Sequence, residues 1–345
     1  MALKAAALAA AALLVSVHVR AGPDSAYQWH LPRGLPTPAV PADNPMSDAK
    51  VALGRRLFSD NRLSIDGRHS CASCHDPSRS FTDGRPVAIG ATGQSLPHNA
   101  MALVNVAYNV SYGWTDPKVT SLEAQMLQPL LNQHPVELGT DPKALATALA
   151  KDASYPREFV AAFPPPAAGG STPTPAVTFD HVVKAIAAYE RTLTAGDSAF
   201  DHYVFGGQHD ALSPSAKRGM ALFFSKSAGC GRCHFGFNFS GHWRDSQGAT
   251  GKASFANNGI GTQRMRIPTL RNIALTAPYM HDGRFGTLDA VIDHYASIAA
   301  VARHDPHSKL DVRLRAFDPS DSDRQDLIAF LESLTDHAPA PAPAD

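Results

Sequence analysis

The sequence has no net charge, no long apolar run and no convincing strand pattern. Its 31 lysine and arginine residues balance 31 aspartate and glutamate residues, so the charge favours neither nucleic acid nor an anionic membrane surface as a partner. The apolar stretch at residues 5–17 is shorter than the roughly 18 residues that usually span a bilayer. Because alternating apolar and polar runs typical of strands do not emerge, we expect a mainly α-helical fold.

The two ends of the chain differ in composition from the rest. Lys4 precedes the apolar run and Val19-Arg20-Ala21 follows it, which is typical of an export signal over residues 1–21, cleaved near Ala21. An uncleaved membrane anchor is the alternative. We assign residues 22–45 to an N-terminal extension, and we expect the proline- and alanine-rich tail at 338–345 to be disordered.

Cysteine is scarce, and all four cysteines fall in two pentapeptides, Cys71-Ala72-Ser73-Cys74-His75 and Cys230-Gly231-Arg232-Cys233-His234. Cys-x-x-Cys-His is typical of covalent c-type haem attachment, in which two thiols add to the vinyl groups and the histidine ligates iron. A zinc ribbon or redox-active dithiols are alternatives, but neither requires a histidine after both pairs. The sequence therefore predicts two covalently bound haem c groups. Such attachment takes place outside the bacterial cytoplasm, which agrees with export to the periplasm.

A similar helix precedes each pentapeptide. Ser47 can cap a helix over Asp48–Phe58, and Ser213-Pro214 can begin one that reaches Phe223. Both helices contain Gly-x-x-Leu-Phe, which predicts two copies of a cytochrome c-like unit, at residues 46–206 and 207–337. The proline-rich stretch at 164–175 is expected to be a loop, and further helices are expected at 180–194 and 322–335.

Several other segments are distinctive: Phe-Thr-Asp-Gly84, Leu-Val-Asn-Val-Ala-Tyr-Asn109, Pro-Val-Glu-Leu-Gly139 and Pro-Thr-Leu-Arg-Asn-Ile-Ala-Leu-Thr-Ala-Pro-Tyr-Met-His-Asp-Gly283. Together with the haem pentapeptides, they resemble the bacterial di-haem cytochrome c peroxidases and their MauG-type relatives over residues 44–335. The resemblance implies that the first haem, on His75, reacts with hydrogen peroxide. It implies that the second haem, on His234, stores or relays an oxidising equivalent.

Two positions separate the branches of this family. The peroxidases place a histidine sixteen residues after the first haem-ligating histidine, where this chain has Ala91, so the first haem is expected to be open. His98 is nearby, but a solvated loop histidine is the simpler interpretation.

The second position concerns the other haem. The peroxidases place a methionine fourteen residues after the histidine of His-Asp-Gly, whereas counting from His281 reaches Tyr295, as in MauG-type enzymes. A phenol oxygen favours ferric and more oxidised iron, whereas a thioether favours ferrous iron. The alternative is that Met280 or His294 is the ligand and Tyr295 is structural.

The resemblance also assigns residues above the first haem. Glu137 is the acid/base that moves a proton during O–O cleavage, Gln125 orients the peroxide, and Pro129 shapes the pocket. We expect burial to raise the pKa of Glu137. Glu137 follows Gln125 by twelve residues, two more than the family pattern, so His134 is a further candidate for the pocket. A solvated Gln125 is the alternative.

Between the haems, the resemblance implies an electron relay and a calcium ion. Trp114 matches the relay tryptophan, and Asn99 with the carbonyls of Thr276 and Pro278 matches the calcium ligands, whose all-oxygen chemistry suits calcium. Core packing of Trp114 and an ordinary polar loop contact of Asn99 are the alternatives.

Within the family, segments such as His-Pro-Val-Glu-Leu-Gly139 and Gly-Phe-Asn-Phe239 most resemble the methanobactin-associated (MbnH-type) branch. This implies that peroxide raises both haems to a shared high-valent state, which oxidises a tryptophan of a periplasmic, copper-binding partner protein. MauG-type enzymes have a tryptophan two residues before the second pentapeptide. This chain has Ala228 there, so Trp243 or a tyrosine is needed as the exit for oxidising equivalents. The rival functions are a peroxidase supplied by a small cytochrome c or cupredoxin, and a di-haem electron carrier.

Overall fold

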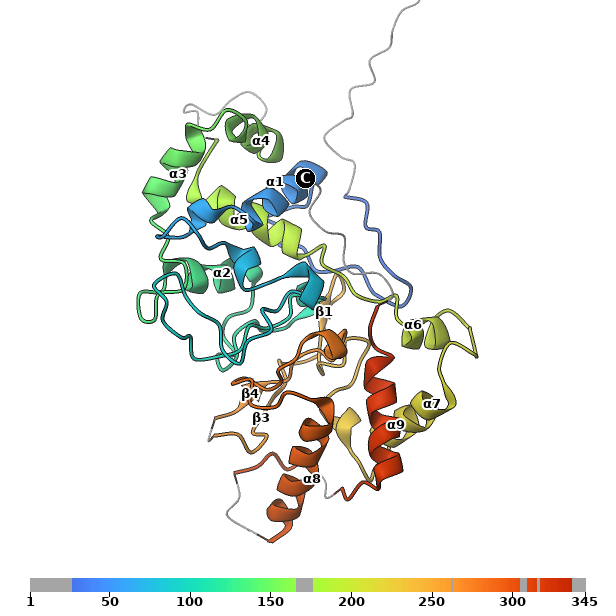
Figure 1. Ribbon diagram of the computed structural model, residues 1–345. Coiled ribbons are helices and arrows are strands. Elements are labelled where there is room, and N and C mark those ends of the chain that lie inside the picture. Colours follow the sequence, from blue (N-terminus) through green and yellow to red (C-terminus); the bar gives the residue numbers. More distant parts are fainter. Residues whose placement is uncertain (1–26, 166–175, 262, 305–308, 315–316, 337–345) are drawn as a thin grey trace, which may run out of the picture.

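The computed structural model describes residues 27–165, 176–261, 263–304, 309–314 and 317–336. The expected signal sequence, most of the proline-rich loop and the expected disordered tail lie outside the described residues. The described chain forms two helical lobes, one above the other in Figure 1. The prediction of a mainly α-helical fold is confirmed.

The upper lobe is built around the pairing of α1 with α5. Its helices are α1 (Asp48–Phe58), α2 (Leu122–Leu131), α3 (Pro142–Ala150), α4 (Tyr155–Ala162) and α5 (Phe179–Glu190), with 3-10 turns at η1 (Asn61–Leu63), η2 (Cys71–Ser73), η3 (Pro77–Arg79) and η4 (Val106–Tyr108). The predicted first helix is confirmed, and the Ser47 side chain caps it by accepting from the Lys50 N–H. The apolar core of this lobe draws on residues between Leu53 and Ala195.

The lower lobe repeats this scheme with α7 packed on α9. Its helices are α6 (Ala199–Val204), α7 (Pro214–Phe223), α8 (Leu288–His304) and α9 (Asp321–Glu332), with 3-10 turns at η5 (Cys230–Arg232) and η6 (Ile273–Leu275). Ser213 caps α7 as predicted. The core of this lobe runs from Phe200 to Leu334, so the change of core falls between Ala195 and Phe200, while the boundary at 206/207 stays a prediction.

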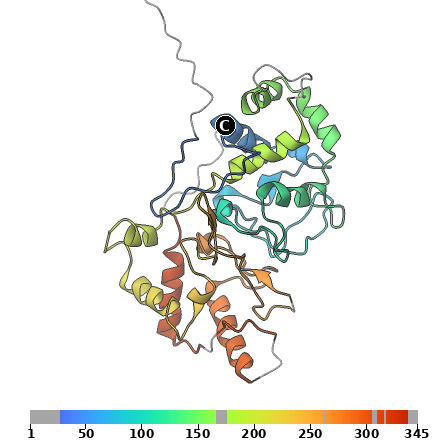
Figure 2. The same ribbon diagram turned by 180° about the vertical axis from the view of Figure 1, so that it is seen from behind.

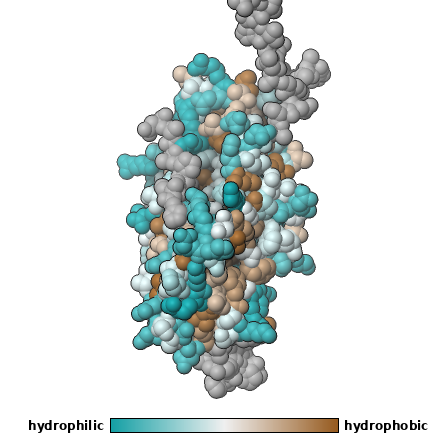
Figure 3. All heavy atoms as spheres, turned by 90° about the vertical axis from the view of Figure 1, so that its right-hand side faces the viewer, coloured by the Kyte–Doolittle hydropathy of each residue, from teal (hydrophilic) through white to brown (hydrophobic). Residues whose placement is uncertain are grey.

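Strands are few and short in the described residues. They form two antiparallel hairpins, β1 (Arg244–Asp245) with β2 (Gly248–Ala249) and β3 (Phe255–Ala256) with β4 (Met265–Arg266). On the face drawn in Figure 3, apolar surface is interrupted by hydrophilic side chains over most of the molecule. Among the described helices, none has the length and apolar character needed to cross a bilayer.

The repeated glycine explains why the two helix pairs resemble each other. A Cβ at Gly54 would lie 1.8 Å from the Ala185 carbonyl oxygen, and a Cβ at Gly219 would lie 1.8 Å from the Asp326 carbonyl oxygen. Each glycine therefore lets its helix cross the partner helix backbone to backbone. The shared Gly-x-x-Leu-Phe sequence therefore reflects the same close helix packing in both lobes, α1 on α5 and α7 on α9.

The lobes meet along two loop segments, 99–114 from above and 265–281 from below, which lie at the waist of the molecule in Figures 1 and 2. The Asn99 N–H donates to the His281 carbonyl (2.8 Å), and the Arg266 N–H donates to the Trp114 carbonyl (2.8 Å). Because both bonds join main-chain atoms, they fix the backbones of the two lobes against each other. The interface therefore holds the residues predicted to lie between the haems.

Candidate haem sites and the region between them

The two pentapeptides adopt the same local structure. Each begins with a single 3-10 turn, and the histidine N–H donates to the carbonyl of the first cysteine at 3.0 Å in both. His75 Nδ1 donates to the Phe81 carbonyl (2.9 Å), and His234 Nδ1 donates to the Phe239 carbonyl (2.8 Å). Since a carbonyl oxygen can only accept, the proton lies on Nδ1 and each Nε2 keeps a lone pair for iron. Burial lowers the pKa of both histidines, that of His234 to about 4.

The four cysteines are half-buried thiols with no disulfide among them. Cys71 and Cys74 line one cavity together with His75, and Cys230 lines another together with His234; many apolar side chains line both. Cys233 joins His234 in the wall of an adjoining cavity. Burial raises the pKa of Cys74 and Cys230 to about 11, so both thiols are protonated at neutral pH. Two thiols beside an imidazole with a free Nε2, in a largely apolar cavity, suit a covalently attached haem, and each pentapeptide provides three ligand side chains where a structural zinc site takes four.

The cavity around His75 also contains the predicted acid/base. Glu137, Gln125 and Pro129 all line it, and burial raises the pKa of Glu137. The twelve-residue spacing left open whether Gln125 and Glu137 could line the same cavity. The additional residues form a turn closed by a bridge between Gln133 and Val136, which brings the chain back to the cavity.

That turn excludes one alternative from the sequence. His134 is exposed and does not line the cavity around His75, so the suggestion that it enters the pocket is wrong. The physical reason is that the turn points outward, where an imidazole is solvated at no cost.

Ala91 stands where the peroxidases have a histidine, and His98 is the nearby histidine that could have replaced it. Ala91 is fixed by its N–H, which donates to the Glu137 carbonyl at 2.7 Å. The expectation that His98 is a solvated loop residue is wrong, because it is half-buried in the cavity wall. Its ring centroid lies 6.1 Å from that of Trp114 and 5.7 Å from that of His281, so it belongs to an aromatic cluster at the lobe interface.

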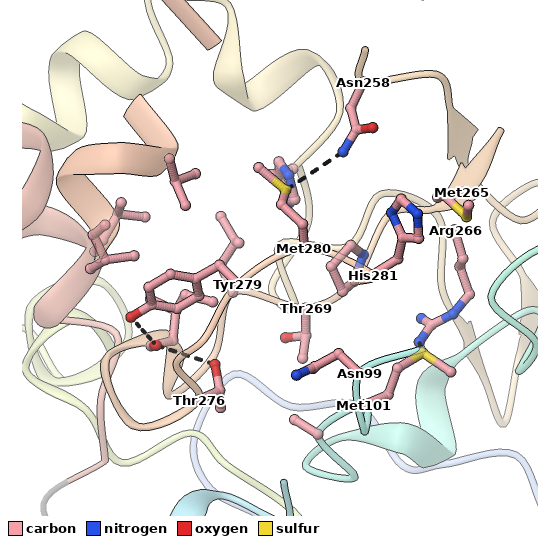
Figure 4. A pocket seen from close by; sticks show the side chains of 18 of the residues that line it. Asn99, Met101, Asn258, Met265, Arg266, Thr269, Thr276, Tyr279, Met280 and His281 are labelled. Carbon is pink, nitrogen blue, oxygen red and sulfur yellow. Dashed lines mark hydrogen bonds between the residues drawn. The ribbon is translucent and has the colours of Figure 1, made fainter. Parts of the chain in front are cut away.

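The second haem cavity contains Tyr295, from the middle of α8, together with His234. Burial raises the pKa of Tyr295 to about 12, opposed by its hydrogen bond with Asn258. His294, the neighbouring alternative, donates through Nε2 to the Asn258 carbonyl (2.8 Å) and does not line the cavity. Met280 lines the same cavity as Tyr295 (Figure 4), so the geometry disfavours His294 and keeps Met280 as a competitor.

Trp114 lies where the relay was predicted. It lines both the cavity around His75 and the cavity around His234, and its indole Nε1 donates to the Asn99 carbonyl (3.1 Å). Arg266, bonded through its main chain to Trp114, lines the same two cavities. One tryptophan and one arginine are therefore common to both sites.

The predicted calcium ligands also lie near this region (Figure 4). Asn99, Thr276 and Pro278 line one cavity, and the Asn99 amide nitrogen donates to the Arg85 carbonyl (2.7 Å) and faces the Pro278 carbonyl at 3.5 Å. An amide nitrogen cannot ligate calcium, so this site would need the Asn99 amide to turn and present its oxygen. Among the described residues, no cluster of three or more His, Cys, Asp or Glu side chains offers a different metal site.

Two buried charged residues of the cavities were not singled out from the sequence. Glu190, at the end of α5, is 6% exposed and lines the cavity around His75, and burial raises its pKa to about 8. Arg266 is 8% exposed. No sequence signal marks them, because their importance depends on which remote segments surround them.

The structure thus contains two haem-attachment turns, each beside a cavity. Trp114 lines both cavities, and the cavity around His75 also contains a buried glutamate. These features define a di-haem c-type redox protein. A family model described as di-haem cytochrome c peroxidase matches residues 48–209. The chain is 35% identical over 314 residues to the methylamine utilization protein MauG of Methylorubrum extorquens, covering 89% of this chain and 83% of the relative. It is 32% identical to cytochrome c551 peroxidase of Pseudomonas aeruginosa, covering 86% of this chain and 81% of the relative.

The comparison with solved structures agrees. The crystal structure of a MauG-like protein associated with microbial copper homeostasis superimposes with a TM-score of 0.83 at 35% identity, covering 92% of this chain and 98% of that one. The chain belongs to the di-haem cytochrome c peroxidase and MauG family. It is accordingly a peroxide-dependent di-haem oxidoreductase, and the family implies two haem c groups.

Proposed function

We propose that this enzyme uses hydrogen peroxide to oxidise a side chain of a partner protein, and that small electron-donor proteins do not drive its normal turnover. The observation that carries the proposal is Tyr295 in the cavity of the second haem, beside His234. With haem bound, the Tyr295 phenol oxygen would hold this iron and would stabilise its oxidised forms. Such a haem holds an oxidising equivalent and is a poor acceptor for electrons from a donor cytochrome.

Bound haem would supply the peroxide-binding and redox chemistry, and the residues around it would direct the protons. Glu137 takes a proton from peroxide and passes it to the departing oxygen, which leaves as water. Gln125, in the same cavity wall, donates a hydrogen bond that orients the peroxide. Overall, peroxide gains two electrons and two protons to give two water molecules, and the partner side chain supplies the two electrons.

A protein substrate must be oxidised at the surface, so electrons need a path inward. Ala228 is buried and cannot carry charge. Trp243 is half-buried and packs on Gly236, two residues after His234, since a Cβ at Gly236 would lie 2.7 Å from the indole ring. Its Nε1 donates to the Asp245 carboxylate (3.3 Å), which stabilises positive charge on the indole. We assign Trp243 as the entry point for electrons from the partner.

The substrate class that we propose is supported by the similarity to a MauG-like protein associated with microbial copper homeostasis. We assign the partner to periplasmic copper-binding proteins and the modified residue to tryptophan, the side chain that gives up electrons most readily. The export signal expected at residues 1–21 of the sequence agrees with this location. Calcium bound by Asn99, Thr276 and Pro278 would keep the loops of the lobe interface in place around Trp114.

To test this function, stoichiometric peroxide is mixed with the purified di-haem protein in the absence of any electron donor. Stopped-flow visible and near-infrared spectra then follow the two haems. A long-lived species in which both haems have changed supports oxidation of a partner protein. A short-lived or absent species, with rapid turnover once reduced cytochrome c is added, would make the protein a peroxidase. Unchanged spectra of both haems under all these conditions would favour an electron carrier.

A further inference from the structure

Arg266 is a buried cation to which none of the described residues offers an acidic partner. Its side chain, on β4, is 8% exposed, and burial lowers its pKa to about 10, so it stays charged at neutral pH. Within the described residues, its Nε has no hydrogen-bond partner, and its Nη2 contacts the Met101 sulfur at 2.8 Å. Figure 4 shows the guanidinium directed at that sulfur. A thioether sulfur is a weak acceptor and does not neutralise a charge.

The other buried arginines differ. Arg271 donates to the Asp201 carboxylate (2.6 Å) and to the Phe237 carbonyl, and Arg191 donates to both oxygens of Glu123 at 2.7 and 2.8 Å. A buried charge left without a partner costs several kcal/mol. The exception at Arg266 therefore points to an anion that enters the cavity with a bound group.

Its position identifies the anion. Arg266 lines the cavities around both haem-ligating histidines, and the group expected in each is a haem. The anionic groups of a haem are its two propionate carboxylates, and a guanidinium pairs with carboxylates through two parallel N–H bonds. No other group of the cofactor offers a carboxylate to the guanidinium.

We propose that Arg266 is the shared counter-ion of the two haems, donating to a propionate of each. Its main-chain N–H bond to the Trp114 carbonyl places this cation beside the tryptophan that both cavities share. Arg266 is thus a positioning residue: by holding one edge of each haem, it sets their separation across Trp114. This inference concerns the bound haems only and holds whether the electron donor is a partner protein or a small cytochrome.

The test compares the holoproteins Arg266→Gln and Arg266→Lys with wild type. The readouts are the midpoint potential of each haem and the propionate bending bands in resonance Raman spectra. Losing the cation in Arg266→Gln should lower both potentials, because a nearby positive charge favours the reduced haem. The propionate bands of both haems should move in both variants, since lysine keeps the charge but loses the paired N–H groups.

Arg264→Gln is the matched control. Arg264 lies two residues away on the same segment, its side chain is 65% exposed and it contacts Asp311 at 3.8 Å, so its loss should leave the bands of both haems unchanged. If Arg266→Gln cannot be obtained with haem bound, the bands of Arg266→Lys decide the question. Unmoved bands in the available Arg266 variants, or a change confined to one haem, would overturn the shared role.

Discussion

At the scale of single residues, the proposed chemistry of the first haem requires Glu137 to change its protonation state. Burial raises its pKa above the ordinary glutamate value, and a base must be ionised to take a proton from peroxide. The rate of the peroxide reaction should therefore fall as the pH drops through this raised pKa and recover as the pH rises above it.

Replacing Glu137 by Gln should slow the peroxide reaction by about 100- to 10,000-fold, the range that a positioned acid/base usually contributes. The acid limb of the pH profile should disappear, while haem content stays unchanged because attachment uses cysteines. Stopped-flow rates between pH 4 and 8 measure both effects. Glu158→Gln, at a half-buried glutamate on α4 that pairs with Arg56, is the control. Wild-type turnover in Glu137→Gln would remove this residue from the mechanism.

The ligand of the second haem is the other question at this scale. Tyr295 and Met280 line the same cavity, so each is replaced by a side chain of similar size that cannot ligate iron. Tyr295→Phe should change the ferric spectrum and shorten the life of the oxidised state, whereas Met280→Leu should leave both unchanged. Electron paramagnetic resonance and visible spectra of the ferric proteins give the answer. The opposite pattern would make Met280 the ligand.

The sequence could identify the haem pentapeptides because their spacing lies within one segment. The family resemblance placed Glu137 and Tyr295 in the cavities that contain His75 and His234, and their roles stay predictions. The sequence could not identify Arg266, because it does not show which remote segments surround a side chain. Nor does it show that the described segments around Arg266 place no carboxylate beside it. It also misjudged His98, because a loop sequence does not show that the aromatic rings of Trp114 and His281 lie against it.

At the scale of elements, capping residues and apolar spacing predicted where helices begin, as at Ser47 and Ser213. The short hairpins β1–β2 and β3–β4 were not predicted, because strands of two residues have no readable alternation. The sequence showed that Gly-x-x-Leu-Phe is repeated, but it did not show why the glycine is needed. The crossing of α1 on α5 and of α7 on α9 shows that the glycine is needed for close backbone contact.

This contact predicts the effect of adding one methyl group. Gly54→Ala and Gly219→Ala should each lower the free energy of unfolding by about 2 kcal/mol, because an oversized side chain in a packed core typically costs ~1–3 kcal/mol, outweighing the helix preference of alanine. Denaturant unfolding of the holoproteins measures it. At Gly286, a Cβ would meet nothing within 4 Å, so Gly286→Ala should be nearly neutral. Equal stabilities for all three variants would mean that the helices do not cross so closely.

At the scale of the whole molecule, the proposed function assigns a different role to each lobe, and residues of the lobe interface line both haem cavities. In the proposed function, peroxide reacts in the upper lobe and the lower lobe stores an oxidising equivalent, and Trp114 and Arg266 line both cavities. The route that we propose for electrons from a partner protein enters the lower lobe at Trp243, which packs on the turn that follows His234. A second aromatic ring, Phe237, lies 5.5 Å from Trp243 between centroids, but phenylalanine is too difficult to oxidise to replace the indole.

This arrangement makes a prediction that needs no partner. When peroxide is added alone, the oxidised protein must eventually draw electrons from its own side chains, and Trp243 should be the surface residue that loses them. Peptide mass spectrometry should find oxygen adducts concentrated on Trp243. In Trp243→Phe the adducts should disappear, the oxidised species should live several-fold longer, and its rate of formation should not change, because the peroxide site is in the other lobe. Tyr203→Phe, a half-buried tyrosine on α6, should behave as wild type. A wild-type lifetime in Trp243→Phe, with adducts elsewhere on the surface, would place the exit at another residue and leave the peroxide chemistry as proposed.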